Sequence, residues 1–209
     1  MHTRLSLGAV LAALFVCAGA AGARAQAESR AGTLEVGGHF SALNLRNYDE
    51  TEPGFGARVT YNVTDHVSLE AEGNFFPRNR RLEGGQKTQG LFGVKAGRRF
   101  ERFGIFAKAR PGFVHFSEGK LRLKTEQVCA AVFPPPEGCV ESGGTNAFAF
   151  DLGGVFELYP SRRTIFRVDV GDTVLHFGRN TLDEPSRRIR PDSFTRHNLQ
   201  TSVGVGFRF

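Results

Sequence analysis

Beyond its first 25 residues the chain has no long run of apolar residues. A membrane-spanning α-helix needs about 20 consecutive apolar residues, so helical membrane spans are excluded. Cysteine is also scarce, because only Cys129 and Cys139 follow this leading segment. Two sulfur ligands without a histidine close in sequence do not make a metal site. We therefore expect neither a metal ion nor another cofactor.

The first 25 residues have the layout of a secretory signal peptide. Arg4 precedes the apolar stretch 5–21, and Ala23-Arg24-Ala25 supplies the small residues of a cleavage site. An alternative is a lipoprotein in which Cys17 becomes the acylated first residue. Val16 fits poorly before such a cysteine, so the signal peptide is favoured.

If the chain is exported, its two remaining cysteines and its charge balance can be interpreted. In an oxidising compartment, an even pair such as Cys129 and Cys139 is expected to form a local disulfide. Removing Arg4 and Arg24 from the 27 basic residues leaves 25 against 21 acidic ones, a net charge of +4. Such a mildly basic exported chain is not expected to bind nucleic acid.

The rest of the chain alternates between apolar and small or polar residues, most clearly in its last eleven residues. A period of two is typical of a β-strand with one apolar face. The pattern recurs seven times before this stretch. We therefore predict eight strands, at residues 33–42, 55–62, 67–75, 89–97, 105–113, 148–158, 166–170 and 194–209. Pro111 lies in the fifth, where we expect a bulge or an early end because proline cannot donate to the ladder.

Long and short connections alternate between these strands. The long connections are residues 46–53, 77–86, 117–144 and 178–193, and the short turns are residues 62–66, 99–103 and 159–163. Outer-membrane barrels place tight turns in the periplasm and long loops outside. We predict an all-β fold, an eight-stranded antiparallel up-and-down transmembrane β-barrel. Its expected limits are 1–25 for the signal peptide, 26–31 for a periplasmic lead and 32–209 for the barrel.

A soluble lipocalin-like barrel has the same alternation with its apolar residues pointing inward. Charge placement favours the membrane alternative, because the charged residues of the strands share the face opposite the apolar one. We assign these charges to the lumen: Glu35, Arg58, Glu70, Glu72, Lys95, Lys108, Arg110, Asp151, Glu157, Arg167, Asp169, Arg196 and Arg208. A barrel of eight strands is filled by side chains, and buried charges must be paired. The favoured interpretation is a salt-bridged plug, and the alternative is a polar conduit, hence a small ion channel.

Turn positions predict which lumen charges face each other. One turn sets Arg58 opposite Glu70 or Glu72. Another sets Lys95 opposite Lys108, and this like-charge pair needs carboxylates from neighbouring strands, with Glu70, Glu72 and Asp151 as candidates.

Several features together resemble the small outer-membrane β-barrel proteins typified by the transmembrane domain of outer membrane protein A. These are the signal peptide, the alternating strands, the Asn62-Val63-Thr64-Asp65 turn and the aromatic end of the last strand. The resemblance implies a monomer in the cell outer membrane, in contact with its lipids. It also implies that the barrel assembly machinery recognises the terminal strand through Val203, Val205, Phe207 and Phe209. Because no peptidoglycan-binding domain follows that strand, we do not expect a tether to the cell wall.

One tripeptide raises an enzymatic alternative. His115-Phe116-Ser117 has the His-x-Ser spacing of a lipid A acyl-ester hydrolase of this architecture, in which serine attacks the ester and histidine removes its proton. Glu118 could orient the histidine. A second copy, His39-Phe40-Ser41, shows that the match arises easily, so polar residues at a strand end are the favoured interpretation.

The long connections carry a cluster of basic residues. These arginines could contact phosphates of lipopolysaccharide or an acidic surface ligand, although solvated loops are often charged. The residues concerned are Arg78, Arg80, Arg81, Arg179, Arg187, Arg188 and Arg190. The chain is therefore expected to act as a structural or surface-interaction protein with a closed, charged lumen.

Overall fold

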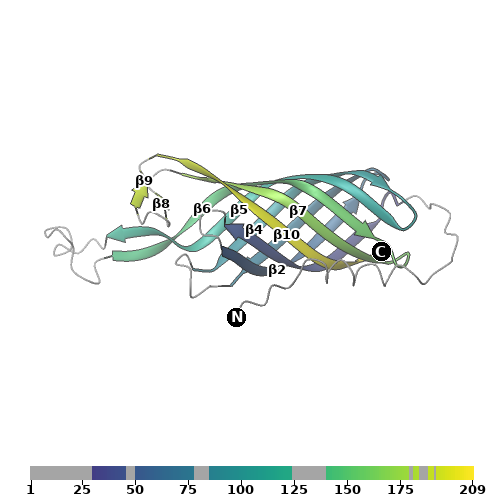
Figure 1. Cartoon of the computed structure of the whole chain (residues 1–209), viewed down its shortest axis with the longest axis horizontal. Coiled ribbons are helices and arrows are strands. Elements are labelled where there is room, and N and C mark those ends of the chain that lie inside the picture. The colour runs from purple at the N-terminus through teal and green to yellow at the C-terminus, as the bar shows by residue number, and fades with distance from the viewer. Residues whose placement is uncertain are drawn as a thin grey trace, which may run out of the picture.

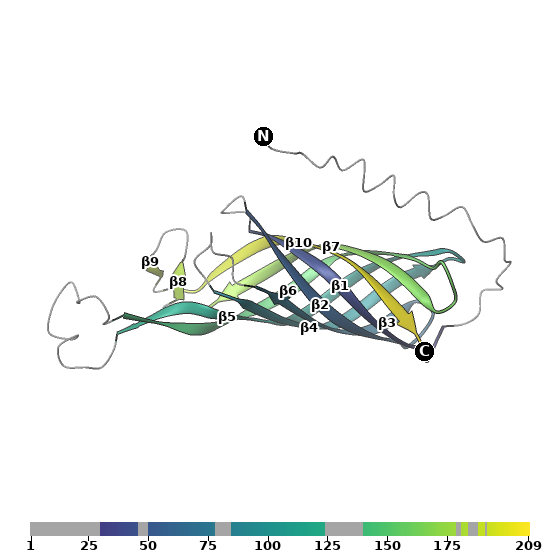
Figure 2. The same cartoon turned by 90° about the horizontal axis from the view of Figure 1, so that it is seen from below.

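The computed structural model describes residues 30–45, 50–77, 85–123, 140–178, 181–183, 188–190 and 192–209. Eight long strands close into an antiparallel barrel in the order β1-β10-β7-β6-β5-β4-β3-β2 (Figures 1 and 2). Their bounds are β1 Leu34–Leu45, β2 Glu50–Asn62, β3 Val67–Phe76, β4 Lys87–Arg99, β5 Phe103–Leu123, β6 Val140–Leu158, β7 Thr164–Phe177 and β10 Phe194–Arg208. The predicted fold class is confirmed.

Several strands extend into segments that the sequence pattern assigned to loops. β2 includes residues 50–53, and β5 and β6 continue as a hairpin through residues 117–123 and 140–144. The last long connection contains a small hairpin of β8 (Thr181–Asp183) and β9 (Arg188–Arg190). These predictions were wrong because polar residues pair along a backbone ladder as readily as apolar ones, so the apolar alternation ended before the strands did.

Pro111 causes no bulge and does not end β5, contrary to the prediction, although the pairing of β5 with β4 skips Arg110 and Pro111. Pro111 pairs with Phe150 of β6 in the same register as its neighbours, and the shift in register lies further along, between Phe116 and Lys120. Against β4, the register is the same on both sides of the proline, at Gly112 and at Ala109. The register is therefore held by neighbours on both strands.

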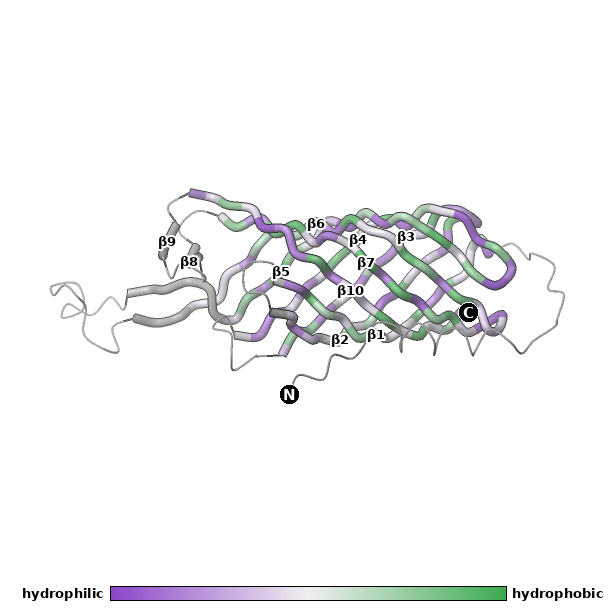
Figure 3. The backbone as a smooth tube through the Cα atoms, viewed as in Figure 1, coloured by the Kyte–Doolittle hydropathy of each residue, from purple (hydrophilic) through white to green (hydrophobic). Residues whose placement is uncertain are grey.

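The apolar face of the strands points outward, which excludes the lipocalin-like alternative. Figure 3 shows hydrophobic and hydrophilic residues alternating along each strand. Phe40 is 77% exposed and Phe207 54% exposed, whereas Glu35 and Lys95 on the opposite face are buried. A continuous apolar outer surface fits a lipid environment.

Short turns and long connections lie at opposite ends of the barrel, here named the turn end and the loop end. Two of the short turns are held by hydroxyl groups: Thr64 Oγ1 accepts hydrogen bonds from two backbone N–H groups, and Ser161 Oγ does the same in the β6–β7 turn. At the barrel seam, Phe209 N–H donates to Leu34 O at 2.8 Å. The turn end is therefore the compact end (Figure 1), and the long β5–β6 hairpin projects from the other.

Some predictions fall on residues outside those described. They are the signal peptide, Cys17 and the disulfide between Cys129 and Cys139. Within the described ranges, no helix is long and apolar enough to cross a membrane.

Candidate functional site

The barrel lumen gathers most of the charged side chains of the strands. Twelve of the thirteen predicted lumen charges are buried, each no more than 9% exposed, and the thirteenth, Arg196, is half-buried on the inward face of β10. They meet because inward positions recur at every second residue on all eight strands.

Two arginines hold the centre of this network. Arg167 donates from Nε to Asp169 at 2.8 Å and binds Glu70 with both terminal nitrogens. Arg110 donates to Asp151 at 2.6 Å and to Glu72 at 2.7 Å. Each guanidinium thus joins two carboxylates, which is the paired, hydrogen-bonded arrangement that buried charges require.

The like-charged lysines lie opposite each other in the register of β4 and β5, and each has its own carboxylates. Lys95 Nζ is 2.5 Å from Glu157 and 3.5 Å from Glu70. Lys108 Nζ is 3.0 Å from Asp151 and 3.4 Å from Asp169. Glu157 of β6 and Asp169 of β7 were not among the candidates for these lysines.

The third candidate carboxylate has other partners. Glu72 lies opposite Arg58 in the β2–β3 register, with 3.5 Å between the charged atoms, and also binds Arg110. Arg58 reaches across the lumen to Asp169 at 3.4 Å. The network therefore connects both sides of the barrel.

At the turn end the lumen holds two buried hydrogen bonds and a cation–π contact. Arg208 Nε donates to Glu35 at 2.8 Å, and the Tyr159 hydroxyl donates to Glu157 at 2.8 Å. Burial, together with the Glu157 carboxylate, raises the pKa of Tyr159, so the phenol stays protonated and remains a donor. The Arg30 guanidinium lies 3.9 Å from the centre of the Tyr159 ring. Burial lowers the pKa of Arg30, with a smaller contribution from Arg208.

Between the central ion pairs and the loop end, one level of the lumen is lined by hydrogen-bonded amides. His39 Nε2 lies 2.6 Å from Asn74 Oδ1, and Asn74 Nδ2 donates to Gln89 at 2.8 Å. Gln89 and Gln200 approach to 3.2 Å, and Thr173 donates to Gln200 at 2.8 Å. Hydrogen-bonded amides here take the place of ion pairs.

Apolar side chains fill the lumen on the β4–β7 side of this level. The buried cluster comprises Leu91, Val114, Ala147, Ala149, Leu175 and Phe177. The sequence analysis assigned only charged residues to the lumen and missed this apolar cluster. Its members occupy the same inward-facing alternate positions as the charges, so the alternation could have identified them. A buried Lys87–Glu52 ion pair was missed as well, because Glu52 was assigned to a loop.

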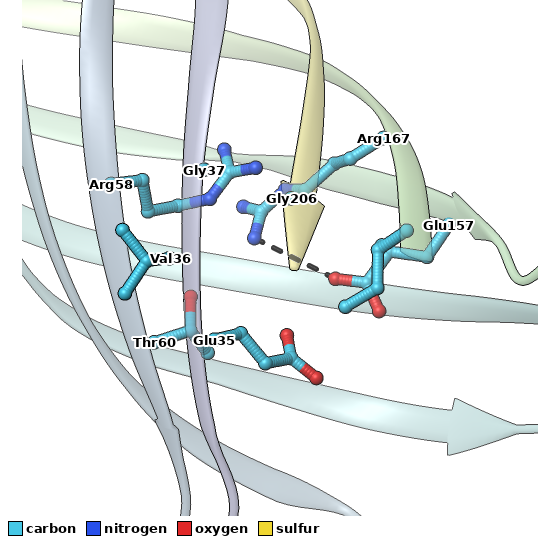
Figure 4. Close-up of a pocket in the computed structure, with 9 residues that line it drawn as sticks. Glu35, Val36, Gly37, Arg58, Thr60, Glu157, Arg167 and Gly206 are labelled. Atoms are coloured by element: carbon cyan, nitrogen blue, oxygen red, sulfur yellow. Dashed lines mark ion pairs between the residues drawn. The ribbon is translucent and has the colours of Figure 1, made fainter. Parts of the chain in front are cut away.

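A cavity of about 10 Å³ lies among the charged side chains of the lumen, and the residues that line it include Arg58, Glu157 and Arg167 (Figure 4). Arg167 lies 3.6 Å from Glu157 across it. This volume has room for about one water molecule. The cavity is a gap in a packed interior.

Of the proposed catalytic residues, His115 and Ser117 share the outward phase of β5, and each is hydrogen-bonded to a different partner. His115 Nδ1 lies 2.7 Å from Asn146 Oδ1. The Ser117 hydroxyl oxygen accepts the Gln86 N–H at 2.9 Å. Glu118 belongs to β5, but its side chain is outside the described part of the structure. In this geometry the histidine is not placed to take a proton from the serine.

A second polar group on the outer wall was not predicted. Asp172 faces outward from β7 and lies 2.7 Å from His197 of β10, with the two side chains 47% and 59% exposed. His176 and Thr195 form a neighbouring pair at 3.0 Å. Among the residues that the structure covers, no group of three or more His, Cys, Asp or Glu side chains is arranged to hold a metal ion.

Comparisons with known proteins return one family and several solved structures. Residues 13–209 match the family described as "Outer membrane protein beta-barrel domain". Solved structures with a similar fold include the N-terminal β-barrel domain of OprF from Pseudomonas aeruginosa (9% identity, 87% of this chain and 100% of that chain covered, TM-score 0.49). Another is neisserial surface protein A (8% identity, 84% of this chain and 94% of that chain covered, TM-score 0.47). A third is the attachment invasion locus protein Ail of Yersinia pestis (15% identity, 86% of this chain and 99% of that chain covered, TM-score 0.46).

A comparison with curated proteins returns no match. The family match spans nearly the whole chain, including all the strands of the barrel. The chain therefore belongs to the outer membrane protein β-barrel domain family, and its place is the cell outer membrane.

Proposed function

We propose that this protein is a closed, non-conducting outer-membrane barrel that holds its long outer loops at the cell surface for interaction with lipopolysaccharide or another acidic surface ligand. The observation that carries the proposal is the filled lumen. In outer-membrane barrels the short turns face the periplasm, so the loop end is the outer end.

The lumen supports closure at three successive levels. Tyr159 and Arg208 fill its periplasmic end, the Arg110 and Arg167 network crosses its middle, and amides and the Leu91 cluster occupy its outer half. Ion flow would require several buried pairs to separate together. Removing one partner from even a single buried ion pair lowers the free energy of unfolding by about 3–5 kcal/mol.

The surface role rests on the basic outer loops. Arg188 and Arg190 belong to the β8–β9 hairpin, and the other loop arginines lie outside the described residues. Guanidinium groups bind phosphate in bidentate geometry, so phosphates of lipopolysaccharide are a suitable ligand.

Single-channel recording tests the closed lumen. We expect no stable openings from the purified, refolded protein in planar bilayers, because the buried pairs stay intact at moderate voltage. An open eight-stranded or larger barrel recorded in the same bilayers serves as the positive control. Stable, reproducible openings would contradict the closed-lumen proposal and favour a small channel.

The hydrolase alternative has its own measurement. Incubation with lipopolysaccharide, followed by mass spectrometry of released acyl chains, is expected to show no release. Release that Ser117→Ala abolishes would overturn the proposed non-enzymatic role.

A further inference from the structure

We propose that the periplasmic rim carries a binding site for the headgroup of an anionic phospholipid, formed by the β4–β5 and β6–β7 turns. Its four arginines are Arg98, Arg102, Arg162 and Arg163. This site lies at the opposite end of the barrel from the outer loops and goes beyond the surface role proposed above.

The two turns form one connected stretch of the rim. Tyr159 N–H donates to the Arg102 carbonyl at 2.8 Å, which joins the turns to each other. Arg208 N–H donates to the Arg163 carbonyl at 2.8 Å, which joins the second turn to β10. Backbone hydrogen bonds thus fix the position of the main chain at Arg102 and Arg163.

Positive charge prevails on this stretch of the rim. All four arginines are exposed, and the exposed carboxylate in these turns is Glu101. The third periplasmic turn, residues 63–66, has no arginine and contains Asp65. Arg99 is the arginine nearest that third turn, and its guanidinium donates to the Thr64 and Asp65 carbonyls. The four exposed arginines of the two joined turns suit an anionic ligand.

The patch lies at the lower boundary of the apolar band. Arg98 is on the outward face of β4, opposite Ile105, which is 54% exposed on the apolar surface. Its guanidinium lies 5.9 Å from the centre of the Phe100 ring. The Phe100 ring stacks on Phe103 at 4.5 Å, and Phe103 lies 6.1 Å from Phe156. A cation beside aromatic rings at the end of an apolar band is typical of the membrane interface.

The position of the patch at the membrane interface indicates which kind of ligand it binds. Guanidinium groups at the interface lie where lipid phosphates lie, and acyl chains can pack along Ile105 and Phe156 above them. The turn end faces the periplasmic leaflet, so the phosphate belongs to a phospholipid and not to lipopolysaccharide of the outer leaflet. A headgroup with net negative charge fits better than a zwitterionic one, because the four arginines outnumber Glu101.

Native mass spectrometry of the full-length refolded protein tests this site. The protein is released from maltoside micelles containing phosphatidylglycerol or phosphatidylcholine with the same acyl chains. We expect the protein to retain phosphatidylglycerol at least about fivefold better, since each arginine near an anionic lipid contributes about a fivefold preference. The variant R98Q/R102Q/R162Q/R163Q is expected to retain the two lipids equally.

The matched control removes the same charge from the other end of the barrel. The variant R78Q/R80Q/R179Q/R187Q is expected to keep the wild-type preference. Equal retention of both lipids by the wild type, an unchanged preference in the rim variant, or an equal loss in the control variant would each overturn the proposal. If the rim variant does not fold, as judged by heat-modifiable gel migration, R98Q and R163Q are tested singly. Each is expected to lower the preference, and no change in either would overturn the site.

Discussion

Asp151 is the clearest residue-scale example of what holds the lumen together. The side chain is fully buried, accepts two hydrogen bonds from Arg110 and lies 3.0 Å from Lys108. Asp151→Asn keeps the shape and removes the charge, which leaves both cations short of a partner. We expect a loss of about 3 kcal/mol in the free energy of unfolding, measured by urea titration in lipid vesicles.

A carboxylate outside the lumen serves as the control for this change. Glu101 is exposed in the β4–β5 turn, so Glu101→Gln is expected to alter the free energy of unfolding by less than about 0.5 kcal/mol. Equal effects of the two substitutions would show that burial in the network does not set the stability.

At the scale of elements, β10 closes the barrel against β1 along a continuous register from Asn44–Leu199 to Glu35–Arg208. Phe209 follows it with a side chain that is 77% exposed, so its ring contributes little packing. We predict that Phe209→Ala lowers the amount of protein assembled in the outer membrane but barely changes the urea midpoint of the refolded barrel. Cell fractionation measures the first quantity.

Phe40 of β1 provides a matched control, because it is also 77% exposed on the lipid-facing wall. Phe40→Ala removes the same side chain from the same kind of surface but not from the terminal strand. Normal outer-membrane levels of Phe209→Ala, or equal losses for both variants, would contradict a special role of the last residue in assembly.

At the scale of the whole molecule, the proposed surface role and the proposed rim site belong to opposite ends of the barrel. We expect the outer-loop variant R78Q/R80Q/R179Q/R187Q to bind immobilised lipopolysaccharide more weakly, by about fivefold for each arginine that contacts phosphate. The rim variant is the control and is expected to bind as the wild type does. Surface plasmon resonance on protein in nanodiscs measures both, and unchanged binding by the outer-loop variant would contradict the proposed surface role.

Much of this architecture could be predicted from local sequence pattern. The alternation around Val203 and Phe207 predicted strands and an apolar outer face, and the opposite phase identified side chains such as Arg110 and Asp151 as inward-facing. The pattern failed where polar and small residues interrupt the apolar alternation, as at residues 117–120 (Ser-Glu-Gly-Lys). It also missed Asp172, an outward carboxylate paired with His197, because that pair joins two strands.

The sequence by itself determined that the chain forms eight long strands and which face of each strand is apolar, because the period of two is a property of the extended backbone. The tertiary structure alone decided which charges from strands distant in sequence are paired. Arg167 binds Glu70 from 97 residues away, and Arg58 reaches Asp169 from 111 residues away. Such partners depend on the register and closure of all eight strands, so no stretch of local sequence specifies them.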